Sequence, residues 1–358
     1  MSTPSNPVSS VADSSRSRNL YRVAIVGAAS LKGKEVAEIL NDRNFPAIDV
    51  KLLDDDESLG QLETMGDEIT FIQSVRAEQF GNVDFTFFAS DQESTRKNWP
   101  IANRAGSAIV DLSYMLEDDP GASVRAPWIE RELGTQIQFE LQPGPVVVAH
   151  PAAVVLALLV LRAQRAGALK RVIATVLEPA SEHGQKGMDE LHQQTVNLLS
   201  FQPLPKAVYD AQVAFNMISR YGENSVPALE TVKRRVLKHY QKLLGNKAPA
   251  PSLMVVQAAI FHGHAFSVYL ETEKPVAIGD VSQALTGEHV SMTRSAEDAP
   301  SNVNAAGQAE VLVSVERDAT QENGYWIWAA ADNLRIAALA AVESAESMVG
   351  TRPRGKIQ

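Results

Sequence analysis

The chain has 358 residues, which is too long for one ordinary hydrophobic core, so we expect two domains. A formal net charge of −10 argues against general nucleic-acid binding, and no apolar stretch reaches the roughly 18 residues of a membrane span. There is no cysteine, which excludes disulfides, thiolate zinc sites and a cysteine nucleophile. Residues 1–19 are serine-rich and lack the apolar segment of a secretory signal, so we expect a disordered tail and a cytoplasmic protein.

The first half of the chain alternates strand and helix patterns. A short apolar run at 21–26 is followed by a small-residue turn, Gly27 to Gly33, and then by a helical pattern. Further strands are predicted at 49–53, 83–88 and 107–112, the last after a helical stretch near 99–105. This alternation predicts an α/β fold with a doubly wound, mostly parallel sheet of the Rossmann type.

The turn from Gly27 to Gly33 has the geometry of a phosphate-binding site, because strand, tight turn and helix present N–H groups and a positive helix end. Ser30 stands where the full dinucleotide fingerprint has another glycine, so both a nucleotide site and a packing turn fit this pattern.

An acidic run follows the second predicted strand. It reads Asp54, Asp55, Asp56 and Glu57, without an arginine. The run is either a solvated loop or a clamp for ribose hydroxyls, and it would repel the 2′-phosphate of NADP. If either nucleotide binds, we therefore expect NAD to bind more tightly than NADP.

The second half has longer strands and several helices. Strands are predicted at 146–149, 170–177, within 253–272, and at 309–315 and 325–330. Helices are predicted at 154–161, 188–199, 227–244 and 333–348, with loops at 178–187 and 295–307. We expect an α+β domain with an extended antiparallel or mixed sheet. The predicted division is 20–145 with 333–350 for the nucleotide-binding domain, 146–332 for the second domain, and 351–358 for a tail.

Several weak motifs occur together in a specific order. They are Gly27-x-x-Ser30-x-x-Gly33, Val110-Asp111-Leu112-Ser113, His150-Pro151-Ala152-Ala153, Gly184-x-x-Gly187-x-x-Glu190-Leu191-x-x-Gln194-Thr195, Ala214-Phe215-Asn216, Phe261-x-Gly263-His264 and Asp332-Asn333-Leu334-Arg335. In this order the chain resembles the aspartate-semialdehyde dehydrogenase family from about 21 to 350. The tract from Pro203 to Asn216 is most similar to its Usg-type branch. The resemblance implies a Rossmann-type domain and a dimerisation domain that forms a homodimer.

The resemblance also implies roles for individual positions. In the family a cysteine attacks the aldehyde, hydride passes to NADP, phosphate cleaves the thioester, and a histidine is the general base. His264 matches that base, whereas the nucleophile position falls on Ala153, or on Ala152 if the loop shifts by one residue. Gln257 stands at the position of the arginine that binds the substrate carboxylate, and Glu178 at that of the glutamine that orients the acyl group.

Among the other positions carried over from the family, some match the family's residue type and one does not. Glu230 and Lys233 match residues that bind substrate, although a solvated ion pair explains them equally well. Glu117 falls near the position of a phosphate-binding arginine. The cofactor contacts implied by the resemblance are Gly27, Ala29, Ser30, Leu31, Gly33, Ser58 and Asn333.

The sequence therefore predicts a catalytically impaired or non-catalytic homodimeric homologue that binds a small molecule or a protein partner. The alternative is an active NAD(P)-dependent oxidoreductase, either an aspartate-semialdehyde dehydrogenase or an enzyme with a related reaction that needs no covalent intermediate. His183 could reach the same cleft as His264 and would then supply acid–base chemistry. His262 and His264 could ligate a metal with a carboxylate, but no third ligand follows at a fixed spacing, so no metal site is predicted.

Overall fold

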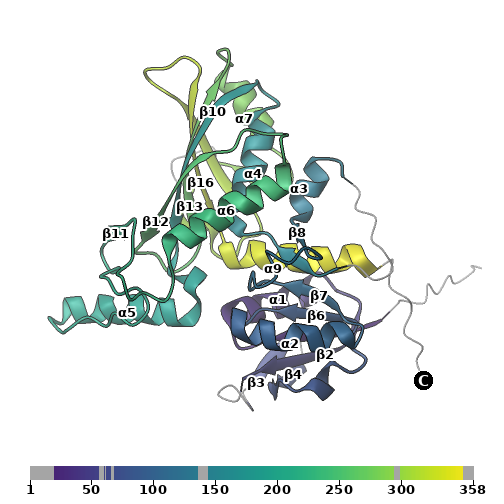
Figure 1. Cartoon of the computed structure of the whole chain (residues 1–358). Coiled ribbons are helices and arrows are strands. Elements are labelled where there is room, and N and C mark those ends of the chain that lie inside the picture. Colours follow the sequence, from purple (N-terminus) through teal and green to yellow (C-terminus); the bar gives the residue numbers. More distant parts are fainter. Residues whose placement is uncertain are drawn as a thin grey trace, which may run out of the picture.

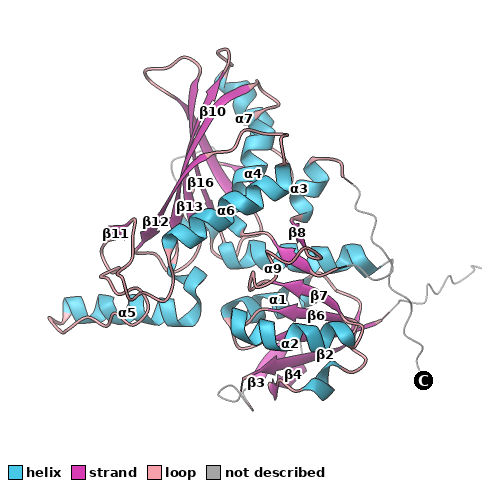
Figure 2. Cartoon of the chain, in the orientation of Figure 1, coloured by secondary structure: helices cyan, strands magenta, loops and turns pink. Residues whose placement is uncertain are grey.

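The structure is a computed structural model that describes residues 20–55, 60, 62–65, 68–135, 144–293 and 299–349. The predicted tails, and Asp56, Glu57 and Ser58 of the acidic segment, lie outside these described residues. Figures 1 and 2 show two sheets, one built from the early part of the chain and one from the later part, with helices packed on and between them. No helix among the described residues has the length and apolar character needed to cross a membrane.

The first sheet is wholly parallel and has the strand order β5-β2-β1-β6-β7-β9-β8. Its strands are β1 (Tyr21–Val26), β2 (Ala47–Asp54), β5 (Gln73–Ser74), β6 (Phe85–Phe88), β7 (Ala108–Asp111), β8 (Ser123–Arg125) and β9 (Val146–Val148). Its helices are α1 (Leu31–Asp42), α2 (Gln92–Arg104) and α3 (Pro127–Glu132), with a 3-10 turn at Ala77–Phe80 and a hairpin of β3 (Leu62–Met65) and β4 (Glu68–Phe71). The predicted doubly wound α/β fold is confirmed.

The second sheet is mixed and has the strand order β11-β12-β10-β13-β16-β15-β14. Its strands are β10 (Leu169–Glu178), β11 (Met217–Ile218), β12 (Ser252–Ala258), β13 (His264–Thr272), β14 (Val290–Met292), β15 (Val311–Arg317) and β16 (Gly324–Ala331). The connecting helices are α4 (Pro151–Ala163), α5 (Gly184–Leu199), α6 (Leu229–Leu244), α7 (Ile278–Leu285) and α8 (Asn302–Ala305), with a 3-10 turn at Ala180–His183. The pairs β10–β12 and β14–β15 are parallel and the others are antiparallel.

Two predicted loops differ from the structure. The last four residues of the segment predicted as a loop from 178 to 187 already belong to α5, because Gly187 does not end the helix but allows close packing against Tyr209 and the carbonyl of Ala180. The segment predicted as a loop from 295 to 307 contains α8, whose first turn is capped by Ser301 accepting a hydrogen bond from the Asn304 N–H at 3.1 Å.

The last helix, α9 (Asn333–Val349), returns from the second sheet to the first. In Figure 1 it lies between the two sheets, beside α1. Asp332 caps it by accepting from Leu334 N at 2.9 Å, and Arg335 then reaches Glu35 at 2.9 Å and Asp42 at 2.7 Å on α1. The chain therefore closes the first sheet with its C-terminal helix.

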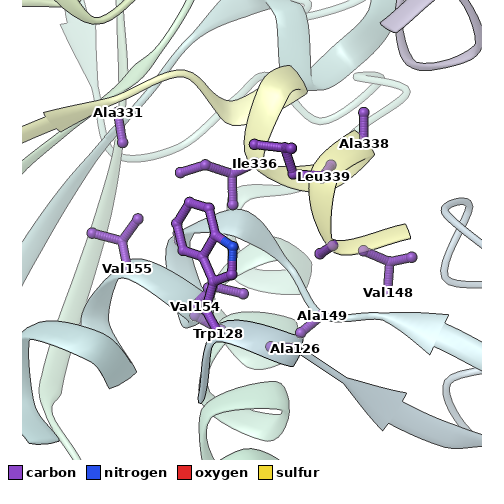
Figure 3. Close-up of a cluster of buried hydrophobic side chains, with 14 of the residues drawn as sticks. Ala126, Trp128, Val148, Ala149, Val154, Val155, Ala331, Ile336, Ala338 and Leu339 are labelled. Carbon is purple, nitrogen blue, oxygen red and sulfur yellow. The ribbon is translucent and has the colours of Figure 1, made fainter. Parts of the chain in front are cut away.

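A continuous apolar core joins the sheets. Figure 3 shows Trp128 of α3 surrounded by Val154 of α4 and Ile336 of α9, with Val148 of the first sheet and Ala331 of the second on either side. All five residues are buried. Because α4 and α9 are packed from both sides, the residues at their N-termini are held rigidly at the junction of the sheets.

Candidate functional site

A cleft of about 540 Å³ runs from the glycine turn of the first sheet to the end of β10 in the second. It is the natural candidate site, because it lies where parallel strands end and where two sheets meet. Its lining includes Ser30, Leu31, Lys32, Ser90, Tyr114, His150, Glu178, Glu182, His183 and Arg235.

At the first end of the cleft, the turn is set by glycine packing and a serine cap. A side chain on Gly27, whose φ is +85°, would overlap the backbone of Ser90, and one on Gly33 would overlap the carbonyl oxygen of Gly27. Ser30 Oγ accepts from Gly33 N and donates to Ala89 O, both at 2.9 Å. Ser30 and Leu31 of the predicted cofactor set line the cleft, while Gly27, Ala29 and Gly33 shape the turn beneath it.

Asp54, the first acid of the acidic run, is fixed beside this turn. It ends β2, and its Oδ2 accepts from the Ala29 N–H at 2.7 Å while Oδ1 accepts from Asp55 N at 2.9 Å. Burial raises the pKa of Asp54, and the hydrogen bond from Ala29 partly opposes that rise. A carboxylate is therefore fixed at the end of β2, beside the glycine turn.

The start of α4 carries two alanines at the predicted nucleophile positions. Ala152 and Ala153 are fully buried in the core. His150 is the N-cap residue, and its Nδ1 accepts from Ala152 N at 3.2 Å. At both positions a methyl group stands inside the protein, with no atom able to attack a carbonyl.

His150 belongs to a charged cluster at the centre of the cleft. Its Nε2 lies 3.9 Å from Glu182 Oε2, and the Lys32 ammonium is equally distant from the same oxygen. Its ring stacks on Tyr114 and lies 5.7 Å from the ring of His264. Burial holds the pKa of His150 well below its usual value, against the attraction of Glu182. Although burial raises the pKa of Glu182, Lys32 and His150 outweigh it and hold that pKa below its usual range.

At the second end, His264, Glu178 and Gln257 come together as predicted substrate-site residues. His264 Nε2 lies 3.3 Å from Glu178 Oε2. Gln257 Nε2 donates to the main-chain oxygen of Glu178 at 3.1 Å and to that of Ala258 at 2.8 Å, and its Oε1 accepts from Tyr221 OH at 2.6 Å. Gln257 is buried and is not among the residues that line the cleft, so its amide serves as an internal brace.

Glu117 takes part in a link between the two sheets. Arg235 Nε lies 3.1 Å from Glu117 Oε2, and His239 Nε2 lies 3.0 Å from the same atom. His239 Nδ1 in turn accepts from the N–H of His150 at 2.9 Å. Burial raises the pKa of Glu117, but hydrogen bonds from His239 and Arg235 outweigh it and lower that pKa to about 2. The guanidinium of Arg235 also lies over the Tyr114 ring.

Like Gln257 and His264, three further predicted site residues are not part of the cleft lining. Glu230 and Lys233 form an ion pair at 3.9 Å whose side chains are 70% and 38% exposed, and they line a neighbouring hollow. Asn333 is buried, its Oδ1 accepting from Gly263 N at 3.0 Å and its Nδ2 donating to Glu182 at 2.9 Å. Across the described part of the chain, no group of three or more His, Asp or Glu side chains is arranged to hold a metal ion.

Sequence reasoning did not select several side chains of the cleft as site residues. They are Lys32, Tyr114, His150, Glu182 and Arg235. The only local signal was the His150-Pro151 pair, since a polar residue before proline is typical of a helix N-cap. Arg235 and Tyr114 have no comparable signal, because they meet across 121 positions of the chain through tertiary packing.

Comparison with known proteins extends these observations. The family "Semialdehyde dehydrogenase, NAD binding domain" matches residues 22–154, and "Semialdehyde dehydrogenase, dimerisation domain" matches residues 158–336. An aspartate-semialdehyde dehydrogenase of Rickettsia bellii is 28% identical over 92% of this chain and 98% of its own. A USG-1 protein homolog of Pseudomonas aeruginosa is 30% identical over 91% and 97%. The solved structure of a probable aspartate-semialdehyde dehydrogenase from Pseudomonas aeruginosa superposes with a TM-score of 0.82, at 28% identity and coverages of 92% and 98%. The resemblance that the motifs indicated is confirmed.

Proposed function

Because the chain belongs to the semialdehyde dehydrogenase family, we propose that it is a nucleotide-binding homodimer that binds a small ligand in the cleft but does not perform covalent aldehyde oxidation. The observation that carries this proposal is the buried methyl group of Ala153 at the first turn of α4. Removal of a nucleophile costs covalent catalysts several orders of magnitude in rate.

The anion-binding positions argue in the same direction. Gln257 is neutral, and its amide is committed to Tyr221 and to two main-chain oxygens, so it cannot form a bidentate pair with a carboxylate. Glu117 presents a carboxylate where the resemblance implies a phosphate-binding arginine, and it neutralises Arg235. The positive charge of Arg235 at the cleft wall is therefore compensated by Glu117, which weakens its attraction for a phosphate ion.

The test is a dehydrogenase assay with aspartate semialdehyde, phosphate and either NAD or NADP. We expect no reduced nucleotide from the natural chain or from Ala153→Cys, and Ala152→Cys controls for a one-residue shift. The triple variant Ala153→Cys, Gln257→Arg, Glu117→Arg is expected to give at most a trace, since it restores all three groups but disturbs their partners. Turnover by the natural chain at a rate typical of dehydrogenases, roughly 1–1,000 per second, would reject the proposal.

We further propose that NAD is preferred over NADP. Asp54 lies beside the turn, and the acidic run continues through Asp55. Two unit charges about 4 Å apart interact by about 4 kcal/mol at an effective dielectric of about 20. A quarter of that energy, about 1 kcal/mol, is about a fivefold change in affinity. Calorimetric titration should show tighter NAD binding, with a gap that narrows at high salt and in Asp54→Asn. Tighter NADP binding would contradict the preference.

The proposed dimer uses the outer face of the second sheet. Ile173, Tyr269 and Trp326 are neighbours in register across β10, β13 and β16 on that face. Ile173 is 41% exposed, Trp326 is 40% exposed, and Met254 on β12 is 55% exposed. A contiguous apolar surface of this kind marks a protein interface, and an obligate one buries more than ~2,000 Å². Light scattering should report two 38.8 kDa chains, and Ile173→Glu should give one.

An active oxidoreductase without a covalent intermediate is the second candidate, favoured by the buried His264–Glu178 pair at the edge of the cleft. In such a reaction an alcohol would pass its hydroxyl proton to this pair and a hydride to the oxidised nucleotide, giving a carbonyl compound and the reduced nucleotide. Formation of reduced nucleotide from NAD and an alcohol distinguishes this candidate from a binding protein.

A further inference from the structure

One oxygen of Glu178 is left without a partner at the wall of the cleft. Glu178 is the last residue of β10, its side chain is fully buried, and it is among the residues that line the cleft. Oε2 faces His264 Nε2 at 3.3 Å, whereas Oε1 has no hydrogen-bond partner among the described residues. A buried carboxylate oxygen without a donor is costly, so a donor supplied from the cleft would stabilise it.

The nearest potential donor is already committed elsewhere. His183 Nε2 lies 3.8 Å from Glu178 Oε1 and 2.7 Å from Tyr221 OH. Gln257 Nε2 donates to two main-chain oxygens, which makes Oε1 of that amide the acceptor for the single Tyr221 proton. The Tyr221 oxygen must then accept from His183, so the Nε2 proton of His183 points to Tyr221 and not to Glu178.

The chemistry of a carboxylate restricts what this oxygen can bind. An ionised carboxylate only accepts hydrogen bonds, so it repels the oxygen of an aldehyde or ketone and binds the O–H of an alcohol. A glutamine at the same place would offer N–H donors and favour a carbonyl oxygen instead. An ammonium group has three hydrogens to donate, but only one acceptor oxygen, Glu178 Oε1, is unpaired here. A hydroxyl group, which donates one hydrogen, matches this single acceptor better.

We propose that Glu178 makes the cleft select a ligand hydroxyl group over the corresponding carbonyl group. The inference rests on the proposed function, since it assumes a small ligand in the cleft, and it names the class of that ligand as an alcohol. Glu178 thereby determines specificity through Oε1, while His264 fixes the position of the carboxylate through Oε2.

The test uses two ligands with one carbon skeleton: the methyl ketone derived from aspartate semialdehyde, and the secondary alcohol formed by its reduction. The ketone replaces the aldehyde because aldehydes hydrate to diols in water. Binding is measured by calorimetry without nucleotide, so that no hydride transfer can occur. A hydrogen bond to a charged group contributes about 1.5 kcal/mol or more, so the alcohol should bind at least about tenfold more tightly.

Glu178→Gln should reverse the order of the two ligands, because the amide then donates into the cleft. Glu190→Gln is the matched control: this buried carboxylate accepts from the N–H groups of Val208 and Tyr209 and does not line the cleft, so its variant should keep the natural order. Equal or tighter ketone binding by the natural chain overturns the inference, as does an unchanged order in a folded Glu178→Gln variant, or binding of neither ligand. A separate NAD titration tests the proposed function independently of this inference. If NAD binds, the proposed nucleotide binding stands even where the inference fails; if NAD does not bind, the proposed function fails as well.

Discussion

The two ends of the cleft are built differently. At the glycine turn the geometry comes from the main chain, since Gly27 and Gly33 leave no room for a side chain and Ser30 completes the cap. At the end of β10 the geometry comes from side chains that bond to one another, such as His264 with Glu178 and Tyr221 with Gln257. A main-chain site is fixed by the fold, whereas a side-chain site can change its chemistry without moving the backbone. Under the proposed function, this difference accounts for a chain that keeps the family's fold without its covalent reaction.

The largest loss of stability is expected from a methyl group added at the glycine turn. In Gly33→Ala the new Cβ would overlap the main-chain oxygen of Gly27, and neither can move without displacing α1 or β1. We expect a loss of about 3 kcal/mol or more in the free energy of unfolding, measured with urea. Gly279→Ala in α7 meets nothing within 4 Å, so it should gain about 0.5–1 kcal/mol. Similar losses in both variants would show that the turn is not specially constrained.

A smaller effect is expected at the other end. Tyr221→Phe removes the donor to Gln257 and the acceptor for His183, leaving two buried polar groups unpaired. The expected loss is about 2 kcal/mol in the free energy of unfolding, with no change in the affinity for NAD. The control is Tyr209→Phe, which removes a buried hydroxyl that has no hydrogen-bond partner among the described residues and should be nearly neutral. A weakened affinity for NAD would mean that the two ends of the cleft are coupled.

The side-chain network should also make stability depend on pH. Burial lowers the pKa of His239 in the folded state. As pH falls below the unfolded pKa of 6.5, the unfolded chain therefore binds a proton that the folded chain does not. The free energy of unfolding that His239 contributes above pH 6.5 is lost over this range. His239→Asn keeps an acceptor for the N–H of His150 but cannot titrate. Between about pH 6.5 and 5, the free energy of unfolding should fall less steeply in this variant than in the natural chain. The two slopes should differ by up to about 1.4 kcal/mol per pH unit. The exposed His192→Asn should leave the slope unchanged.

The smallest effect is expected on the exposed face of α6. Glu230→Gln removes one partner of a solvated pair with Lys233, and such pairs contribute about 0–0.5 kcal/mol. Unfolding and NAD titration should both give values close to those of the natural chain. A clear loss of ligand affinity would restore this residue to the substrate site that the family resemblance implies.

More of the fold than of the candidate site could be predicted from the sequence. Apolar runs such as 21–26 and 83–88 locate buried parallel strands, because a strand covered on both faces needs apolar side chains throughout. The glycines of the turn were recognisable because close main-chain packing admits no other residue.

The site depends on contacts that no local pattern encodes. Gln257 could be identified as a neutral residue in place of an arginine, but its role as a brace depends on Tyr221, 36 positions away. Glu117 and His239 meet across 122 positions, and Tyr114 owes its place in part to a left-handed backbone at φ 64°. These arrangements follow from how the two sheets pack, which sequence periodicity does not describe.

The C-terminal helix has a consequence for how the protein is made. The hydroxyl of Tyr21, in the first strand, donates to the carbonyl of Val349, 328 residues later, at 2.7 Å. A ribosome that adds about 5–20 residues per second needs roughly 16–66 s to produce the second partner after the first. All strands of the first sheet, which end with β9 at Val148, are synthesised within that interval and before the layer formed by α9. The nascent chain must therefore wait with an apolar surface uncovered, which makes this half the expected client of chaperones during translation.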